Sequence, residues 1–211
     1  LLLWPVFLVV AVLIKLGDNG PVLFKQERIG RRCKPFLIYK FRTMVVDAPQ
    51  RGAAITARND HRITPVGRFL RHTKLDELPQ LLNVLKGDMS LVGARPEVAR
   101  YVDLFRDEYT EILKMRPGIT DMASIRFRDE SSLLSSSADA EAVYIERILP
   151  EKLRLARHYA SQSSSVYDVR LILTTVICLL YPARAIERVA DLLNPFRVWL
   201  GVIAQGAALL A

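Results

Sequence analysis

The first residues of the chain restrict its fold more than any other stretch. Leu1 to Ile14 contains no charged side chain, and Lys15 ends this apolar run. A membrane-spanning helix needs about 20 consecutive apolar residues, so the run is too short to cross a bilayer. Pro5 lies inside the run and would break or kink a helix that extends further upstream. Three interpretations therefore stay open: a buried core helix, the end of a spanning helix that is cut short, or one arm of a hairpin that enters the membrane and returns.

The surroundings of this run favour contact with a membrane. The chain starts with Leu1 rather than methionine, so we expect the segment to be truncated or processed. A signal peptide is not favoured, because the run has neither a basic region before it nor a cleavage site of small residues after it. Lys15 stands where a cation would meet anionic lipid headgroups.

The charge balance points to a polyanionic partner. Lysine and arginine total 30 against 22 acidic residues, which gives a net charge of +8. Nucleic acid, an anionic membrane surface and a phosphorylated substrate would all suit this surplus. Aromatic residues make up only 8% and form no stripe with basic ones, so an RNA-stacking surface is not favoured. Two cysteines without ligand spacing argue against a zinc site and a disulfide framework.

Local patterns predict a mixed α+β chain that is mainly helical. Residues 22–26 and 36–41 are rich in β-branched and aromatic side chains, with turn signals between them, so we expect a small β-hairpin. A long polar loop should follow at 45–67. The remaining expected elements are helices at 66–71, 77–86, 96–113, 140–160 with an interruption near Pro150, and 166–181, an extended piece at 122–130, and amphipathic or apolar pieces after Pro182. A Rossmann domain is not expected, because no Gly-rich turn connects a strand to a helix.

Two adjacent carboxylates, Asp76 and Glu77, stand at the start of a leucine-rich segment. A proline is tolerated in the first turn of a helix, so Pro79 predicts Asp76 near the N-cap and Glu77 at the first helical position. Leucines at 78, 81, 82 and 85 have the spacing of one apolar helix face, and Gly87 should end the helix. Both acids would then lie at the positive end of an anchored helix.

This pair has two compatible interpretations. Asp is a favoured N-cap and acids in the first turn are stabilised by the helix dipole, so "LDELP" alone is more typical of a cap. Cations flank the pair, however, and a helix start among arginines is an anion site. Carboxylates there could also hold Mg²⁺ together with substrate phosphates, and an aspartate can attack phosphorus. The flanking cations are Arg62, Arg68, Arg71, Lys74, Arg95 and Arg116.

Three blocks resemble one known family in order and spacing: "GPVLFKQERIGRRCKPFLIYKFRTM", "NDHRITPVGRFLRHTKLDELPQLLNVLKGDMSLVGARPE" and "RPGIT". The chain resembles the bacterial sugar transferases, which are monotopic phosphoglycosyl transferases, from the first apolar segment to about Tyr181. The resemblance implies transfer of a phosphosugar from a UDP-sugar to undecaprenyl phosphate with release of UMP, as the first membrane step in the assembly of an exopolysaccharide, O-antigen or glycoprotein glycan. It also implies a location on the cytoplasmic face of the bacterial inner membrane.

The resemblance assigns roles to individual residues. Asp76 would become the covalent phosphosugar intermediate, Glu77 would complete the dyad, and Mg²⁺ would bind at both. Arg95 matches the arginine of the family's "PRP" element. The first segment would be a re-entrant membrane helix that breaks at Pro5, next to Trp4.

Several positions depart from the family's pattern. Ala94 stands for the first proline of "PRP", and Asp121 and Met122 replace the glycine and tryptophan of "PGITGW". The latter region is expected to touch the nucleotide or sugar, so the sugar is left open. Trp4 stands where a small polar residue is usual.

Further residues are expected to bind substrate. Lys40 and Arg42 alternate along one predicted strand, and Asp168 resembles part of the family's "LDLK" element, although an N-cap role explains it equally well. The predicted substrate-binding set is Lys40, Arg42, Arg62, Arg71, Arg95, Arg116 and Asp168.

The chain as a whole divides into a re-entrant helix at 1–16, a catalytic domain at 17–181 and an appendage at 182–211. Amphipathic helices should lie at the membrane interface. Two other functions compete with catalysis. One is a basic protein that binds nucleic acid or anionic lipid. The other is a non-catalytic protein of the same fold that serves as a scaffold for glycan-assembly partners. Because no nucleic-acid motif is present and the dyad is intact, we favour the enzyme, with inner-membrane lipid and no nucleic acid among its partners. A homo-oligomer and a monomer both stay open.

Overall fold

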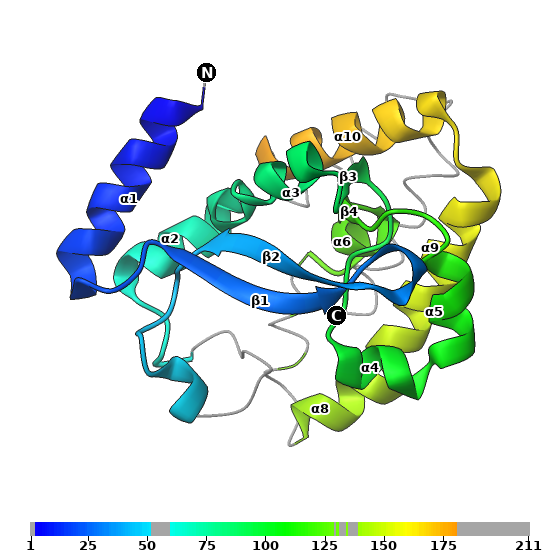
Figure 1. The fold of residues 1–211 in the computed structure, drawn as a ribbon, viewed down its shortest axis with the longest axis horizontal. Coiled ribbons are helices and arrows are strands. Elements are labelled where there is room, and N and C mark those ends of the chain that lie inside the picture. Colours follow the sequence, from blue (N-terminus) through cyan, green and yellow to red (C-terminus); the bar gives the residue numbers. More distant parts are fainter. Residues whose placement is uncertain (1–2, 52–59, 129, 131–133, 135–138, 181–211) are drawn as a thin grey trace.

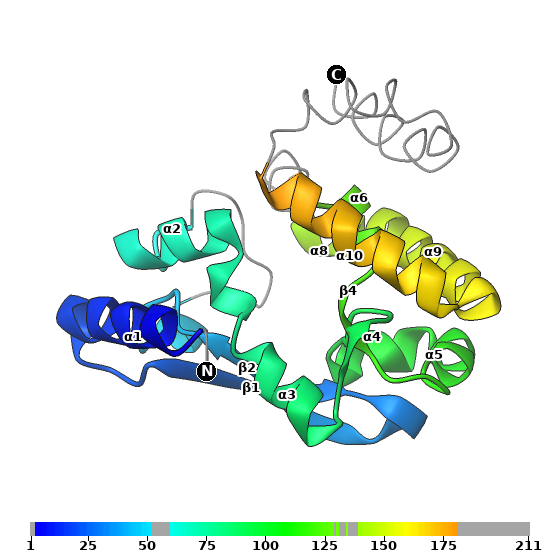
Figure 2. The same cartoon turned by 90° about the horizontal axis from the view of Figure 1, so that it is seen from above.

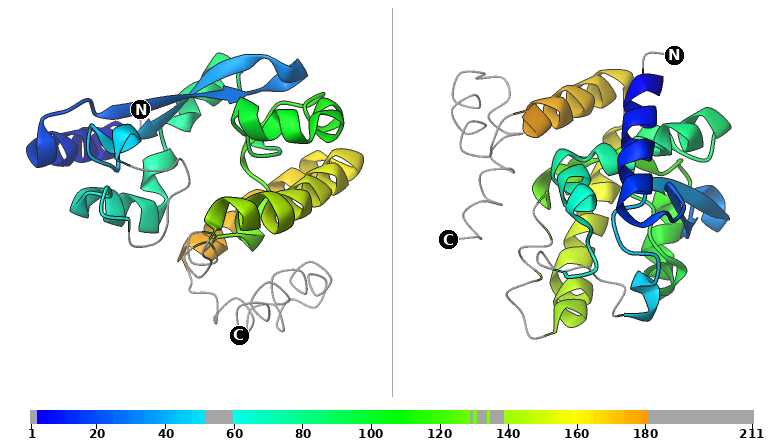
Figure 3. Two further views of the ribbon diagram at one scale, coloured as in Figure 1. Left: turned by 90° about the horizontal axis from the view of Figure 1, so that it is seen from below. Right: turned by 90° about the vertical axis from the view of Figure 1, so that its left-hand side faces the viewer.

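A computed structural model describes residues 3–51, 60–128, 130, 134 and 139–180. The described chain is mainly helical with a small antiparallel hairpin, as the sequence predicts. The predicted appendage at 182–211 lies outside the described residues. The hairpin runs across the molecule in Figure 1, and Figures 2 and 3 show helices α1 (Trp4–Asp18) and α2 (Pro65–Thr73) grouped at one of its ends.

The hairpin consists of β1 (Leu23–Ile29) and β2 (Pro35–Phe41), paired antiparallel from Leu23 opposite Phe41 to Ile29 opposite Pro35. A short turn at Arg31–Cys33 joins the strands. The amide of Arg32 in this turn donates to the carbonyl of Leu113 at 2.7 Å, which ties the far end of the hairpin to the helical layer. The predicted hairpin is confirmed.

The apolar N-terminal segment forms helix α1 (Trp4–Asp18). Pro5 lies in its first turn, where a missing amide hydrogen costs nothing. One side of α1 is buried, with Val10 and Ile14 packed against Phe41 and Leu70. Among the described residues, no helix combines the length and apolar composition needed to span a bilayer. The re-entrant geometry is not confirmed and stays a prediction.

A second, parallel pair of strands connects two segments for which the sequence analysis predicts no strand. Strand β3 (Ser90–Val92) pairs with β4 (Gly118–Thr120). Three-residue strands carry too little alternation to be recognised from the sequence. Directly after β4, the chain forms helix α6 (Met122–Arg126), so the extended piece predicted at 122–130 is wrong.

Helices α4 (Ala99–Leu104), α5 (Arg106–Ile112) and α9 (Leu149–Gln162) lie at the opposite end of the hairpin from α1 (Figure 1). The single helix predicted at 96–113 is wrong: Phe105, at φ −129° and ψ 48°, separates α4 (Ala99–Leu104) from α5 (Arg106–Ile112). The interruption expected near Pro150 is confirmed, because a π-helical segment separates the following two helices. In chain order these elements are α8 (Ala140–Val143), the π-helical segment (Tyr144–Ile148), α9 (Leu149–Gln162) and α10 (Ser165–Leu180).

Helix α3 (Gln80–Lys86) buries a polar face rather than the predicted leucine face. Leu82 is 40% exposed and Leu85 is 84% exposed, whereas Gln80 and Asn83 are fully buried. The Asn83 Oδ1 accepts the Tyr39 amide at 3.1 Å, and its Nδ2 donates to the Leu37 carbonyl at 2.7 Å. Asn83 thus satisfies backbone groups of β2 that would otherwise be buried without partners.

This contact predicts that Asn83→Ala destabilises the protein. The substitution leaves one amide and one carbonyl of β2 without their side-chain partner, which should lower the free energy of unfolding by about 2–3 kcal/mol. The measurement is urea denaturation of purified protein. Leu85→Ala on the same helix is the control and should change stability by less than about 0.5 kcal/mol, because Leu85 is exposed. Equal losses in the two variants would contradict this account of α3.

Candidate active site

The two acids lie in a short turn before α3 rather than at its N-cap. Helix α2 (Pro65–Thr73) ends at Lys74, whose φ of 57° is left-handed, and a 3-10 turn (Leu75–Glu77) follows. The N-cap of α3 is Pro79, and neither carboxylate accepts a hydrogen bond from the backbone amides of this helix. The predicted capping role is therefore wrong, because the acids come one turn too early in the chain. Their carboxylates are left for other contacts.

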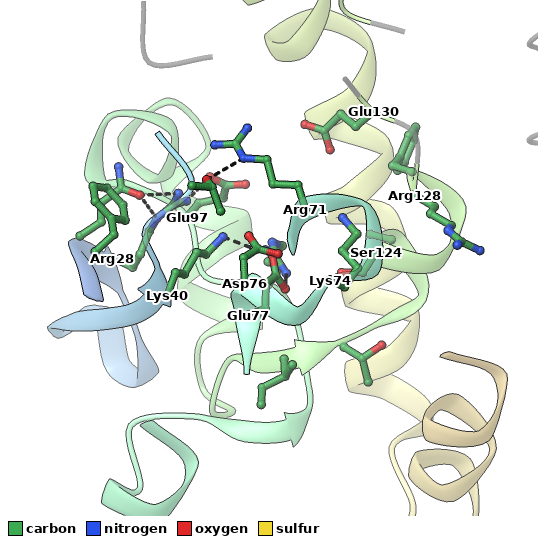
Figure 4. Close-up of a pocket in the computed structure, with 18 of the residues that line it drawn as sticks. Arg28, Lys40, Arg71, Lys74, Asp76, Glu77, Glu97, Ser124, Arg128 and Glu130 are labelled. Carbon is green, nitrogen blue, oxygen red and sulfur yellow. Dashed lines mark hydrogen bonds and ion pairs between the residues drawn. The ribbon is translucent and has the colours of Figure 1, made fainter. Parts of the chain in front are cut away.

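The acids line a cavity of about 1620 Å³ between the hairpin, α2, the segment around Arg95, and helices α6 and α9. Figure 4 shows Lys40, Arg71, Asp76 and Glu77 converging on this space. Most of the predicted site residues are brought together here. The predicted residues that line the cavity are Lys40, Arg42, Arg62, Arg71, Asp76, Glu77 and Arg95.

Glu77 is held by two cations. The Arg95 guanidinium binds its carboxylate through both terminal nitrogens, with Nη1 at 3.1 Å from Oε2 and Nη2 bound to Oε1. The Lys40 Nζ lies 3.2 Å from Oε1. Burial alone would raise the pKa of Glu77, but the charges of Arg95 and Lys40 hold it well below its ordinary value. The same contact raises the pKa of Arg95.

Asp76 has the opposite environment. Its side chain is buried, and its Oδ1 has no hydrogen-bond partner among the described residues. Burial and the neighbouring charge of Glu77 raise the pKa of Asp76, although Lys40 opposes them. An ionised carboxylate with an unsatisfied, desolvated oxygen is poised to bind a cation or to attack an electrophile.

The remaining arginines of the cavity differ in what they contact. Arg71 donates from Nε to the Thr43 hydroxyl at 2.8 Å and has no acidic partner among the described residues. Burial lowers the pKa of Arg71, and the charge of Asp76 counteracts this. Arg62, in contrast, forms an ion pair with Asp60 at 2.6 Å and donates to a backbone carbonyl. Arg42 is buried just after β2, beside Gly20.

Two predicted binding residues and the membrane pair lie outside the cavity lining. Arg116 is near the end of α3, where it approaches Gly87. Asp168 accepts the Tyr159 hydroxyl at 2.7 Å in the first turn of α10, while the Ser164 hydroxyl accepts the Tyr167 amide at the start of that helix. Their substrate roles stay predictions. Trp4 and Pro5 are on α1, where Trp4 is 62% exposed.

The comparison with known proteins settles the family. A model of the family described as "Bacterial sugar transferase" matches residues 1–182. The chain belongs to this family. An "Exopolysaccharide production protein PSS" from Rhizobium leguminosarum bv. phaseoli is 43% identical over 84% of this chain and 86% of that protein.

Longer relatives of this sugar transferase share the same region. A "UDP-N-acetylgalactosamine-undecaprenyl-phosphate N-acetylgalactosaminephosphotransferase" from Aeromonas hydrophila is 39% identical over 83% of the chain, and a "UDP-glucose:undecaprenyl-phosphate glucose-1-phosphate transferase" from Escherichia coli (strain K12) is 36% identical over 83%. The matched regions make up 39% and 36% of those two proteins.

The structure of the sugar transferase adds site residues that the sequence analysis missed. Glu97 and Asp121 are both buried beside Arg95, and Ser124 lines the cavity from α6. The sequence offered two signals for Asp121: it departs from the family's pattern in a region expected to touch the nucleotide or sugar, and Asp is a favoured N-cap residue. Its Oδ1 does accept the Ser124 amide at 2.7 Å.

The carboxylates of the cavity are the candidate ligands for a metal ion. Within the described part of the sugar transferase, no group of three or more His, Cys, Asp or Glu side chains could hold an ion. Mg²⁺ needs fewer protein ligands, because it is commonly bound by one or two carboxylates together with substrate phosphates. The unpartnered Oδ1 of Asp76 fits this mode, whereas Glu77 already contacts Arg95 and Lys40.

The environment of Asp76 predicts that replacing this aspartate with a neutral residue stabilises the fold. Because its pKa is raised in the folded protein, ionised Asp76 destabilises the fold at neutral pH, and this cost disappears as pH falls toward the unfolded value of 3.8. Asp76→Asn should raise Tm at pH 8 by about 2–4 °C, the shift that 1 kcal/mol gives in a domain of this size. The gain should shrink at pH 4.

Thermal unfolding at both pH values measures this effect. Asp103→Asn is the matched control, because the Asp103 side chain is 65% exposed on α4 and should leave Tm unchanged at either pH. A lower Tm for Asp76→Asn at pH 8 would show that Asp76 stabilises the fold.

Proposed function

We propose that the chain transfers a phosphosugar from a UDP-sugar to undecaprenyl phosphate and releases UMP. The observation that carries this proposal is a buried carboxylate, Asp76, with an unsatisfied oxygen beside the cations Lys40, Arg71 and Arg95. A nucleophile surrounded by cations suits attack on an anionic phosphate. The names of the Aeromonas hydrophila and Escherichia coli relatives support the donor and acceptor.

The first half-reaction forms a covalent intermediate. A carboxylate oxygen of Asp76 attacks the β-phosphorus of the UDP-sugar. The bond from that phosphorus to the bridging oxygen breaks, and UMP leaves with the electron pair. The product is an acyl phosphate that joins Asp76 to the sugar phosphate. Such a nucleophile splits one difficult transfer into two easier steps.

The second half-reaction returns the enzyme to its starting state. A phosphate oxygen of undecaprenyl phosphate attacks the same phosphorus, and the Asp76 carboxylate leaves with the electrons of the broken bond. The product is a sugar on a polyprenyl diphosphate. Phosphoryl transfer depends mainly on positioning and charge neutralisation. The guanidinium of Arg71, which has no acidic partner among the described residues, would supply charge to the transferred phosphate.

Mg²⁺ is proposed to bind at the dyad through Asp76 Oδ1, next to the Glu77 carboxylate that Arg95 and Lys40 hold in place. When bound, the ion would neutralise negative charge on the diphosphate of the donor. Within the protein itself, Arg95 and Lys40 keep Glu77 ionised, so no proton has to leave its carboxylate when a cation binds at the dyad.

The exposed apolar side chains support contact with a lipid surface, which we propose is the cytoplasmic face of the inner membrane. The outer side of α1 is apolar from Leu8 to Leu16, and α10 carries a stripe at intervals of three and four residues along one face. Large exposed apolar patches mark interaction surfaces, and lipid suits an acceptor with a polyprenyl tail. The α10 stripe consists of Val166, Val169, Leu173, Val176 and Leu180. A monotopic, re-entrant α1 is part of this proposal.

Release of UMP tests the reaction. Purified protein in detergent should release UMP from one member of a panel of UDP-sugars when Mg²⁺ and undecaprenyl phosphate are present. Asp76→Asn should abolish release, because the amide is a poor nucleophile, and a chelator should do the same. If no donor yields UMP while the protein still binds anionic lipid, and Asp76→Asn does not weaken that binding, the chain is a binding protein instead.

Arg71 gives a second, graded prediction. Arg71→Gln removes a cation that faces the cavity and should lower kcat/KM for the UDP-sugar by roughly 10- to 100-fold, the value of one hydrogen bond to a charged group. Arg154→Gln is the matched control, because the Arg154 side chain is 60% exposed and does not line the cavity. Unchanged kinetics in Arg71→Gln would remove Arg71 from the binding site.

A further inference from the structure

The segment that carries Arg95 is tied to the fold at every residue from Gly93 to Glu97. Parallel-strand partners hold its first half, the hairpin holds its second half, and Arg95 lies in the middle. The bonds are Gly93 N–H to Thr120 O at 3.1 Å, Gly118 N–H to Ala94 O at 3.0 Å, Arg95 N–H to Asp121 Oδ2 at 3.3 Å, Arg28 Nη1 to Pro96 O at 3.2 Å, and Ile29 N–H to Glu97 O at 2.9 Å. Five consecutive residues are thus fixed from two sides.

Asp121 joins Arg95 to the start of α6. It is 4% exposed, and its two oxygens accept two different amides, that of Arg95 and, at 2.7 Å, that of Ser124. Capping α6 needs only one of these bonds. The second bond fixes the backbone from which the Arg95 side chain extends toward Glu77.

Glu97 anchors the same segment from the other side. It is 8% exposed; its Oε1 accepts the Tyr144 hydroxyl at 2.6 Å and its Oε2 lies 3.1 Å from Arg28 Nη1. Arg28 therefore binds both the Glu97 side chain and the carbonyl before it. Figure 4 shows Arg28 and Glu97 next to Lys40 at the edge of the dyad.

We propose that Asp121 and Glu97 are positioning residues that set the Arg95 guanidinium against Glu77 and so hold the turn that carries Asp76. An arginine side chain is flexible, and its two-nitrogen contact with a carboxylate forms only when its backbone is correctly placed. Neither acid forms a hydrogen bond or ion pair with Asp76 or Glu77 among the described residues, so each acts through Arg95. The catalytic consequence of this inference rests on the proposed function.

The first test compares two N-cap aspartates. Asp121→Asn keeps one oxygen to cap α6 but replaces the other acceptor with an amide group, which cannot accept the Arg95 N–H. It should lower kcat roughly 10- to 100-fold, the loss expected for a displacement of about 1 Å at a site. Asp139→Asn is the control, because Asp139 caps α8 in the same way and lies outside the cavity lining. Asp139 accepts both of its amides through Oδ1, which Asn retains, so Asp139→Asn should leave Tm and activity close to the wild type, and only Asp121→Asn should lose activity.

A double-mutant cycle separates positioning from a general structural role. In the Arg95→Lys background, Asp121→Asn and Glu97→Gln should change kcat by less than about 2-fold, because the guanidinium that they position is already gone. Glu111→Gln, at an exposed ion pair on α5, is the control for Glu97→Gln. If the losses multiply in the double variants, Asp121 and Glu97 act independently of Arg95 and the inference is wrong.

A stability cycle tests the inference without any reaction. Asp121 and Glu77 share no direct bond in the described residues, so coupling between them must pass through Arg95. Glu77→Gln should lower the free energy of unfolding less in the Asp121→Asn background than in the wild type. It should also lower it less in the Glu97→Gln background than in the wild type. Zero coupling overturns the positioning inference even if the enzyme is active. An inactive wild type with the expected coupling would overturn the proposed function alone.

Discussion

The ion pair between Glu77 and Arg95 is the contact on which the rest of the site depends. With Lys40 it joins three segments that are far apart in the sequence: the end of the hairpin, the turn before α3 and the segment between β3 and α4. Both side chains are partly buried, so the pair costs desolvation when it forms, and loss of either partner leaves a partly desolvated charge without its counterion. The geometry of the cavity is therefore maintained by an interaction that tolerates little displacement.

The two acids of the dyad show how one turn can give neighbouring carboxylates different properties. Glu77 is surrounded by cations that lower its pKa, and Asp76 is buried beside Glu77, which raises its pKa. Titratable groups whose environments move their pKa values apart commonly divide the work of a site. Here Glu77 is fixed by its ion pairs, and Asp76 is the residue proposed to act as the nucleophile.

Features encoded locally could be predicted from the sequence, and those that depend on distant partners could not. The hairpin, α2, α10 and the convergence of Asp76, Glu77 and Arg95 follow from short patterns or from family resemblance. The predicted buried face of α3 was wrong because Asn83 forms hydrogen bonds with the backbone of β2, over 40 residues earlier in the chain. The spacing of the leucines contains no information about these bonds. Arg116 was predicted to bind substrate because it follows the acidic pair among other arginines, but its side chain approaches Gly87 at the end of α3. The order of charges along the chain does not determine which of them reach the cavity.

Helix α3 is inverted relative to an ordinary surface helix, with the amides of Gln80 and Asn83 inside and Leu82 and Leu85 outside, and this has a geometric consequence. The turn that carries Asp76 continues directly into α3. Leu82 and Leu85, which are exposed, follow Asp76 by six and nine residues in the chain. The proposed nucleophile and an exposed apolar surface therefore belong to one continuous stretch of chain. In the proposed reaction, a phosphate on a long hydrocarbon chain would approach Asp76 while its tail packs against those leucines.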